Sequence, residues 1–112
     1  MKILGIGVDI IENSRIKKSL KNPLFVKRIF TNNEIIQAKK IKNNVAFYSK
    51  RYAAKEAFSK SIGTGFRDNF NFNDISVTND KMGKPIFIIN NKIKNIIKKR
   101  FNISSYKFFL SI

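Results

Sequence analysis

The order of the apolar segments predicts an α+β fold with a mostly antiparallel sheet and helices packed on it. Three observations predict this class. Residues 2–12 are β-branched and apolar, residues 44–62 carry a long helical pattern, and residues 75–80 and 86–89 are two short apolar runs around a turn. At 112 residues the chain is expected to form a single domain over residues 1–112.

Residues 2–12, KILGIGVDIIE, are expected to form a buried strand. Gly5 and Gly7 weaken a strand, and such glycines often mark the close approach of another backbone or of a ligand. Asp9 and Glu12 are unusual for a core strand, because a buried carboxylate without a partner is costly. Asp9 therefore either lies at an exposed strand end or is paired or bound to a metal ion.

Three short helices are expected to follow. Asn13 or Ser14 is expected to cap the first, and Pro23 suits the first turn of the second. Thr31 and Glu34 have the spacing of a capping box and are expected to open the third.

Residues 44–62 form the longest helical pattern, with one stripe expected to face the core. Gly63 and Gly65 are expected to end this helix, and residues 66–73 to form a loop. The members of the stripe are Phe47, Arg51, Ala54, Phe58 and Ile62.

Residues 75–80 and 86–89 are expected to form a hairpin, and residues 90–101 an amphipathic helix. Residues 106–112 alternate in character and predict a final strand, with Tyr106, Phe108, Leu110 and Ile112 on one face. An exposed apolar strand edge is a liability, so either another subunit covers it or further residues follow Ile112. We expect the natural gene to encode further residues.

The composition limits the available chemistry. The chain has no cysteine and no histidine, so disulfides, thiolate sites and imidazole bases or ligands are excluded. The lack of cysteine fits a reducing cytoplasm, and no run is long and apolar enough for a membrane span. Catalysis would have to use carboxylates, lysine, hydroxyls or metal-bound water.

A net charge of +16 favours anionic partners. The bias toward lysine, isoleucine and asparagine is typical of A+T-rich coding sequences, so charge alone is weak evidence for nucleic-acid binding. One alternative is a small RNA-binding module that combines basic residues with stacking phenylalanines. It gives no role to Asp9 and Glu56, and residues 106–109, YKFF, are its only hint.

The segment RYAAKEAFSKSIGTG, residues 51–65, places Tyr52, Glu56, Lys60 and Gly63 along one helical stripe. The simplest interpretation is a surface Glu–Lys pair followed by a glycine cap. The alternative joins Glu56 to Asp9.

Two carboxylates from different elements suit Mg²⁺, which keeps several waters and accepts substrate phosphate oxygens. Lys60 would then neutralise a phosphate. Gly63, Thr64 and Gly65 would allow a ligand to approach the backbone closely.

Four motifs occur in order: GIGVDIIE, FTNNE, RYAAKEAFSKSIGTG and ISVTNDKMGKP. Together they resemble the bacterial holo-acyl-carrier-protein synthases, the small trimeric class of 4′-phosphopantetheinyl transferases, from residue 3 to the end of the chain. The resemblance implies the 4′-phosphopantetheinyl transferase fold. It also implies transfer of 4′-phosphopantetheine from coenzyme A to a serine of apo-acyl carrier protein, with release of 3′,5′-ADP, in fatty acid and lipid biosynthesis.

In this family, catalysis is mostly positioning and charge neutralisation. The resemblance implies that Asp9 and Glu56 bind Mg²⁺ and that Lys60 contacts the phosphates. Because histidine is absent, the serine proton would pass to a magnesium-bound water or hydroxide, or to Glu56 through water.

The resemblance also implies a coenzyme A site. Arg51 is a candidate for the 3′-phosphate, which its planar fork suits. The remaining candidates are two loops and one lysine: Gly63, Thr64 and Gly65; Gly83, Lys84 and Pro85; and Lys60.

The expected protein partner is an acidic apo-acyl carrier protein. Arg15 is the first candidate for its contact, supported by Lys17, Lys18, Lys21 and Arg28. The family forms homotrimers with coenzyme clefts between subunits, and no nucleic-acid or membrane partner is expected. The family's last strand usually continues through a Ser-His dipeptide into a return strand, so a relative that binds carrier protein without catalysis is a second alternative.

Overall fold

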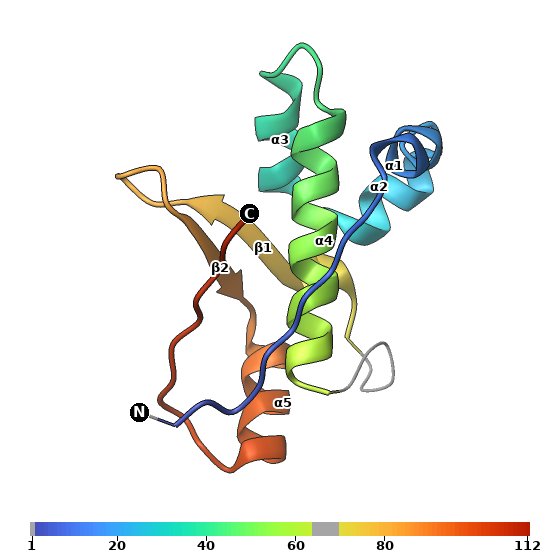
Figure 1. Cartoon of the computed structure of the whole chain (residues 1–112). Helices are drawn as coiled ribbons and strands as arrows, with labels where there is room; N and C mark the ends of the chain where they lie inside the picture. Colours follow the sequence, from blue (N-terminus) through green and yellow to red (C-terminus); the bar gives the residue numbers. More distant parts are fainter. Residues whose placement is uncertain (1, 64–69) are drawn as a thin grey trace.

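The computed structural model describes residues 2–63 and 70–112, and Figure 1 shows their α+β arrangement. The regular elements of these residues are five α-helices, one short 3₁₀ helix and one antiparallel two-stranded sheet. The predicted fold class is confirmed. The elements are α1 (Asn13–Ser19), α2 (Pro23–Ile29), α3 (Asn32–Lys39), α4 (Val45–Ser61), η1 (Phe72–Asp74), β1 (Ile75–Asn79), β2 (Pro85–Ile89) and α5 (Asn91–Phe101).

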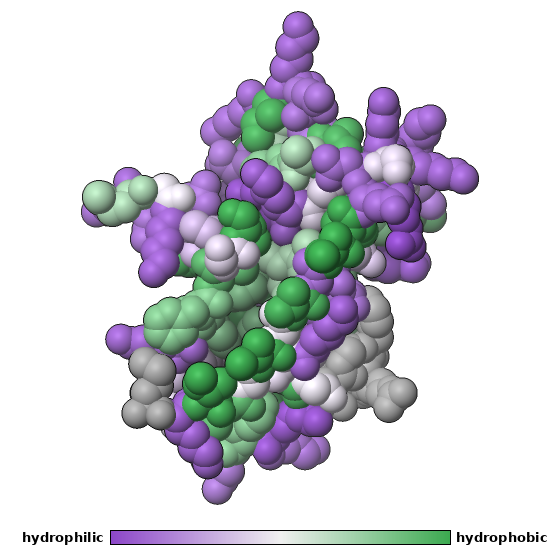
Figure 2. All heavy atoms as spheres, viewed as in Figure 1, coloured by the Kyte–Doolittle hydropathy of each residue, from purple (hydrophilic) through white to green (hydrophobic). Residues whose placement is uncertain are grey.

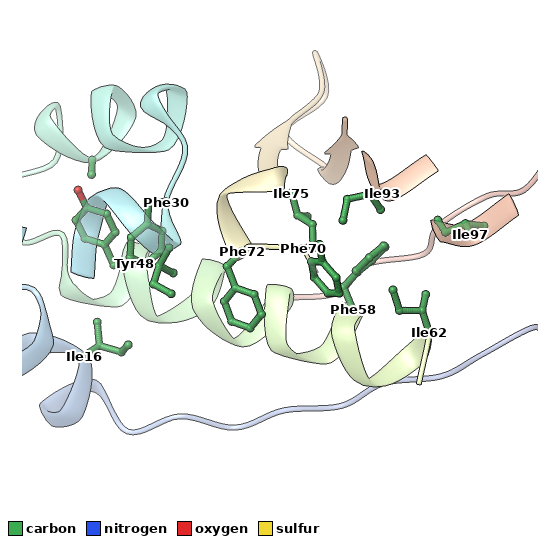
Figure 3. Close-up of a cluster of buried hydrophobic side chains, with 12 residues drawn as sticks. Ile16, Phe30, Tyr48, Phe58, Ile62, Phe70, Phe72, Ile75, Ile93 and Ile97 are labelled. Carbon is green, nitrogen blue, oxygen red and sulfur yellow. The ribbon is translucent and has the colours of Figure 1, made fainter. Parts of the chain in front are cut away.

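Helix α4 is the central element, and the other elements pack around it (Figure 1). The predicted core stripe is confirmed: Arg51, Ala54, Phe58 and Ile62 are buried, and Phe47 is half-buried. Figure 3 shows buried side chains from α1 to α5 lying along α4. The orientation of α4 is therefore set by contacts along its whole length.

The predicted capping box at the start of α3 is confirmed. Glu34 N donates to Thr31 Oγ1 at 3.2 Å, and Thr31 N donates to Glu34 Oε1 at 2.9 Å. Pro23 occupies the first turn of α2, as expected.

The cap of α1 differs from the prediction. The N-cap is Glu12, without a side-chain bond, so Asn13 and Ser14 lie inside the first turn. The backbone oxygen of Glu12 accepts from the amide groups of Arg15 and Ile16. An extended residue just before the helix supplies this acceptor whatever its side chain, which is why composition alone misplaced the cap by one or two residues.

The predicted hairpin is confirmed, with β1 antiparallel to β2 and Val77 opposite Phe87. Its turn places Gly83 at a φ of 82°, a conformation that glycine adopts without steric cost. Gly63, at a φ of 71°, ends α4 as expected. Gly65 lies outside the described residues, as does most of the loop expected at residues 66–73, whose last described part includes η1.

The two terminal segments are extended but are not strands, contrary to prediction. Residues 2–10 are mostly exposed rather than buried, and the segment lies along α4 (Figure 1). At the other end, Tyr106, Phe108 and Leu110 are half-buried on one side, as the alternation predicts, but Ile112 is exposed. A strand requires a neighbour for its backbone groups, and in the described part of the chain neither segment has one.

Candidate functional site

The N-terminal segment packs directly on the backbone of α4 through its two glycines. A Cβ atom on Gly5 would lie 1.8 Å from the Ser61 oxygen, and one on Gly7 would lie 1.7 Å from the Ala57 oxygen. Two extended residues advance about 6.6 Å, close to the ~5.4 Å of one helical turn. The segment therefore runs antiparallel to α4, and the expected close approach at both glycines is confirmed. The next residue on this face is Asp9.

Asp9 reaches Lys60 across this contact. Lys60 Nζ lies 2.9 Å from Asp9 Oδ1 and donates to the Val8 oxygen at 3.3 Å. The Asp9 side chain is only 14 % exposed, so Asp9 is not an exposed strand end. The ion pair of Lys60 is thus with Asp9, which replaces the simple surface pair with Glu56 that spacing alone suggests.

Glu56 completes the group, lying one helical turn before Lys60 on α4. Burial raises the pKa of the Glu56 carboxyl, and the nearby charge of Asp9 raises it further, while Lys60 acts in the opposite direction. The Glu56 carboxyl therefore lies within electrostatic range of both Asp9 and Lys60. We call Asp9, Glu56 and Lys60 the carboxylate cluster.

Tyr52 lies on the same side of α4, and its ring is held between Phe25 and Phe72, with centroids 6.3 and 5.6 Å away. Burial raises the pKa of the Tyr52 hydroxyl; Glu56 and Asp9 add to the rise, and Arg15 opposes it. Tyr52 thus lies within electrostatic range of both carboxylates of the cluster and of Arg15, the first basic residue of α1.

The donor set of the cluster suits a hard cation. No group of three or more acidic, histidine or cysteine side chains able to hold a metal occurs within residues 2–63 and 70–112. Mg²⁺ needs only one or two carboxylates, because water and phosphate oxygens complete its octahedral shell. The residues present therefore fit magnesium, with Asp9 and Glu56 as the candidate protein ligands.

Arg51 lies on a different face of α4. It is 7 % exposed, and its guanidinium carbon lies 3.7 Å from the centroid of the Phe47 ring. Helical residues are about 100° apart, so Arg51 and Lys60 project from opposite sides of the helix. The structure does not bring Arg51 to the cluster, and its contact with a 3′-phosphate stays a prediction.

The predicted glycine loops lie apart from each other. Gly63 ends α4, and its oxygen accepts from Arg100 Nη2 at 3.2 Å. Thr64 and Gly65 are outside the described residues. The turn with Gly83, Lys84 and Pro85 projects away from α4, so within one chain it is separate from the cluster (Figure 1).

The candidate carrier-binding residues are exposed on α1, just after it, and on α2. Helix α1 follows the N-terminal segment directly and packs on α4, and its Arg15 lies within electrostatic range of Tyr52, which also senses Asp9 and Glu56. These residues are Arg15, Lys17, Lys18, Lys21 and Arg28.

Sequence reasoning missed a buried ion pair between Lys55 and Glu34. Both side chains are fully buried. The signal was present: Lys55 follows Ala54 in the core stripe of α4, and a lysine there requires a buried partner. Glu34 was assigned only as a helix cap.

An apolar groove separates the two terminal segments. Residues 2–9 and 105–112 form its walls around a hollow of about 960 Å³, and α4, α5 and Phe87 contribute its remaining lining. On the N-terminal segment, Ile6, Val8 and Ile10 are 74, 71 and 91 % exposed. Figure 2 shows apolar side chains in a line over this segment.

Comparison with known proteins identifies the class. The family model of the 4′-phosphopantetheinyl transferase superfamily matches residues 5–108, and the chain belongs to this family. The family predicted from the sequence motifs is confirmed, and it replaces the alternative of a small RNA-binding module. No described helix is long and apolar enough to cross a membrane.

Two curated relatives carry the name holo-[acyl-carrier-protein] synthase. The one from Pelagibacter ubique (strain HTCC1062) is 70 % identical over 100 % of this chain and 88 % of its own length. One from Clostridium botulinum (strain Eklund 17B / Type B) is 47 % identical over 98 % of this chain and 86 % of its own.

Solved structures of the same enzyme match the fold. The holo-[acyl-carrier-protein] synthase of Neisseria meningitidis has a TM-score of 0.81 at 34 % identity, covering 89 % of this chain and 82 % of its own. The synthase of Bacillus anthracis, in complex with CoA (3′,5′-ADP), has a TM-score of 0.72 at 48 % identity. The match covers 80 % of this chain and 77 % of the other.

Proposed function

We propose that this chain is a holo-[acyl-carrier-protein] synthase. It transfers 4′-phosphopantetheine from coenzyme A to a serine of apo-acyl carrier protein and releases 3′,5′-ADP. Family membership, the name of the 70 % identical relative and the coenzyme-bound neighbour support this activity. The observation that carries it is the contact between Asp9 and Lys60, which brings an N-terminal carboxylate to the helix that bears Glu56.

Asp9 and Glu56 would hold Mg²⁺, which when bound neutralises charge on the pyrophosphate. Lys60 has a flexible stem and a half-exposed side chain, so its ammonium is able to exchange Asp9 for a phosphate oxygen. The chain itself holds these groups in position before the substrate binds, because the extended N-terminal segment and α4 pack closely together at Gly5 and Gly7.

Glu56 is our candidate for the group that receives the serine proton, directly or through a water molecule. The chain has no histidine, so an imidazole base is excluded, and Glu56 belongs to the cluster beside which the serine would bind. An acidic carrier protein would dock on the basic face of α1, which places its serine beside the cluster.

We also propose a homotrimer. The exposed apolar side chains of residues 6–10 and the adjoining groove supply surface that a further subunit would cover. A neighbouring subunit would also bring its hairpin turn, with Gly83, Lys84 and Pro85, toward the coenzyme held at the cluster. The proposed location is the cytoplasm, and the proposed pathway is fatty acid biosynthesis.

The test is to incubate the protein with coenzyme A, Mg²⁺ and apo-acyl carrier protein and to weigh the carrier by mass spectrometry. The carrier should gain one phosphopantetheine group, and Asp9→Ala or Glu56→Ala should each abolish the gain. Glu12→Ala is the matched control, because Glu12 is exposed and makes no side-chain cap. No gain with the wild-type chain would refute the enzyme and favour a relative that only binds the carrier.

A further inference from the structure

The buried pair of Lys55 and Glu34 is the strongest feature that the proposed activity does not use. Lys55 Nζ donates to Glu34 Oε1 and, at 2.7 Å, to the Ile29 oxygen. It also lies 5.2 Å from the centroid of the Phe30 ring. Because both side chains are fully buried, Lys55 does not reach a phosphate from this position.

The Glu34 carboxylate is bonded on both oxygens. Oε1 accepts from Lys55 and from Thr31 N, and Oε2 accepts from Val77 N at 2.9 Å. The Thr31 hydroxyl in turn lies 3.0 Å from the Ser76 hydroxyl. One carboxylate and one ammonium thus join α4 to the end of α2, the start of α3 and strand β1.

Lys55 is the residue immediately before Glu56. Neighbouring helical residues are about 100° apart, so holding Lys55 inward fixes the direction in which Glu56 projects. Lys60, one turn further on, is fixed by the same rotation. The core contacts along α4 hold the helix in place, and these directional hydrogen bonds further restrain its rotation about its axis.

We propose that Glu34 and Lys55 are positioning residues that set the rotation of α4 and thereby hold Glu56 and Lys60 in register with Asp9. This inference rests on the proposed magnesium and phosphate roles of the cluster. It places Lys55, the lysine of the AAKEAF motif, in the core rather than in contact with the substrate. It also gives Glu34, which caps α3, a second role.

The test compares the wild-type chain with a double variant that carries both Glu34→Gln and Lys55→Met. Lys55→Met alone leaves an unpaired buried carboxylate and should unfold the protein at a much lower temperature. The double change removes both charges but leaves a single acceptor oxygen for the amide groups of Thr31 and Val77, so only part of the melting temperature should return. Glu34→Gln alone keeps the lysine, and its melting temperature should lie between those of the Lys55→Met variant and the double variant.

Mg²⁺ binding in the presence of coenzyme A, measured by calorimetry on the folded double variant, should weaken at least tenfold. The kcat should fall while the KM for the carrier protein stays unchanged, because the basic face of α1 is untouched. Lys94→Met, at an exposed position on α5, is the control and should leave both quantities unchanged.

Two outcomes would overturn the inference in different ways. A folded double variant with wild-type Mg²⁺ affinity and wild-type kcat would show that the pair only stabilises the fold, and would leave the proposed function intact. Absence of Mg²⁺ binding by the wild-type chain would remove the metal site and this inference together.

Discussion

Lys60 donates to Asp9 before any metal arrives, so one ammonium already neutralises part of the charge of the two carboxylates. A metal ion would compete with Lys60 for Asp9. Phosphate oxygens would offer Lys60 another partner. At the scale of single residues, Mg²⁺ and coenzyme A are therefore expected to favour each other's binding.

Replacing the lysine tests this competition. In Lys60→Met, Mg²⁺ alone should bind roughly two- to fivefold more tightly, since the lost pair is an exposed one, while coenzyme A should bind more weakly. Calorimetry with each ligand separately measures both effects. Weaker binding of Mg²⁺ alone would contradict the competition.

The raised pKa of Glu56 predicts a pH dependence of stability. The folded state holds the Glu56 proton more tightly than the unfolded chain, so this residue should cost stability as pH rises from the unfolded pKa through the folded one. Denaturant unfolding of metal-free protein, compared with Glu56→Gln, measures this cost. Identical pH profiles of the two proteins would refute it.

At the scale of elements, the site forms between the N-terminal segment and α4, which are joined by packing and not by strand pairing. The N-terminal segment lies on α4 because Gly5 and Gly7 expose no Cβ atom where the helix backbone passes. The buried pair behind α4 fixes the opposite side of the same helix. The cluster therefore forms between a packed glycine contact and a hydrogen-bonded core.

Gly7→Ala should separate the segment from the helix. Its Cβ atom would meet backbone rather than a flexible side chain, so the segment must move, and we expect a loss of about 1–3 kcal/mol in the free energy of unfolding. Phosphopantetheine transfer should fall with it, because Asp9 moves away from Glu56. Unfolding curves and the mass-spectrometric assay measure the two effects, and full activity would contradict the account.

At the scale of the whole molecule, two surfaces are available to partners, one basic and one apolar. The candidate basic residues lie exposed on α1, just after it and on α2, whereas a run of exposed apolar side chains follows the N-terminal segment beside the groove. Figure 2 shows both kinds of surface on one face. The first surface suits an acidic carrier protein and the second suits a further subunit.

Arg15→Glu should raise the KM for the carrier protein by about tenfold and leave that for coenzyme A unchanged. A glutamate in the first turn of α1 is favourable to the helix, so the fold should persist. Lys94→Glu, on α5, is the control for net charge. An equal rise in the KM for the carrier protein and for coenzyme A would argue against this docking surface.

Ile6→Lys should convert the proposed trimer into monomers and reduce activity. The side chain is 74 % exposed in the single chain, so the substitution costs the isolated subunit little, whereas a buried charge in an interface is expensive. Ile36→Lys, at an exposed position on α3, is the control. Light scattering gives the mass, and an unchanged mass would refute the assigned surface.

The local patterns of the sequence predicted the helices, the hairpin, the capping box at Thr31 and the core stripe of α4, because each depends on residues close in the chain. They also identified Gly5 and Gly7 as points of close approach, and the motifs identified the family.

The tertiary structure decided what depends on neighbours distant in the chain. It joined Lys60 to Asp9 and Lys55 to Glu34, and it left both terminal segments without strand partners among the described residues. Spacing predicts which residues share a face of one element, because helical and strand periods are local. Which partner a charged side chain finds, and whether an extended segment becomes a strand, is set only when separate elements pack together.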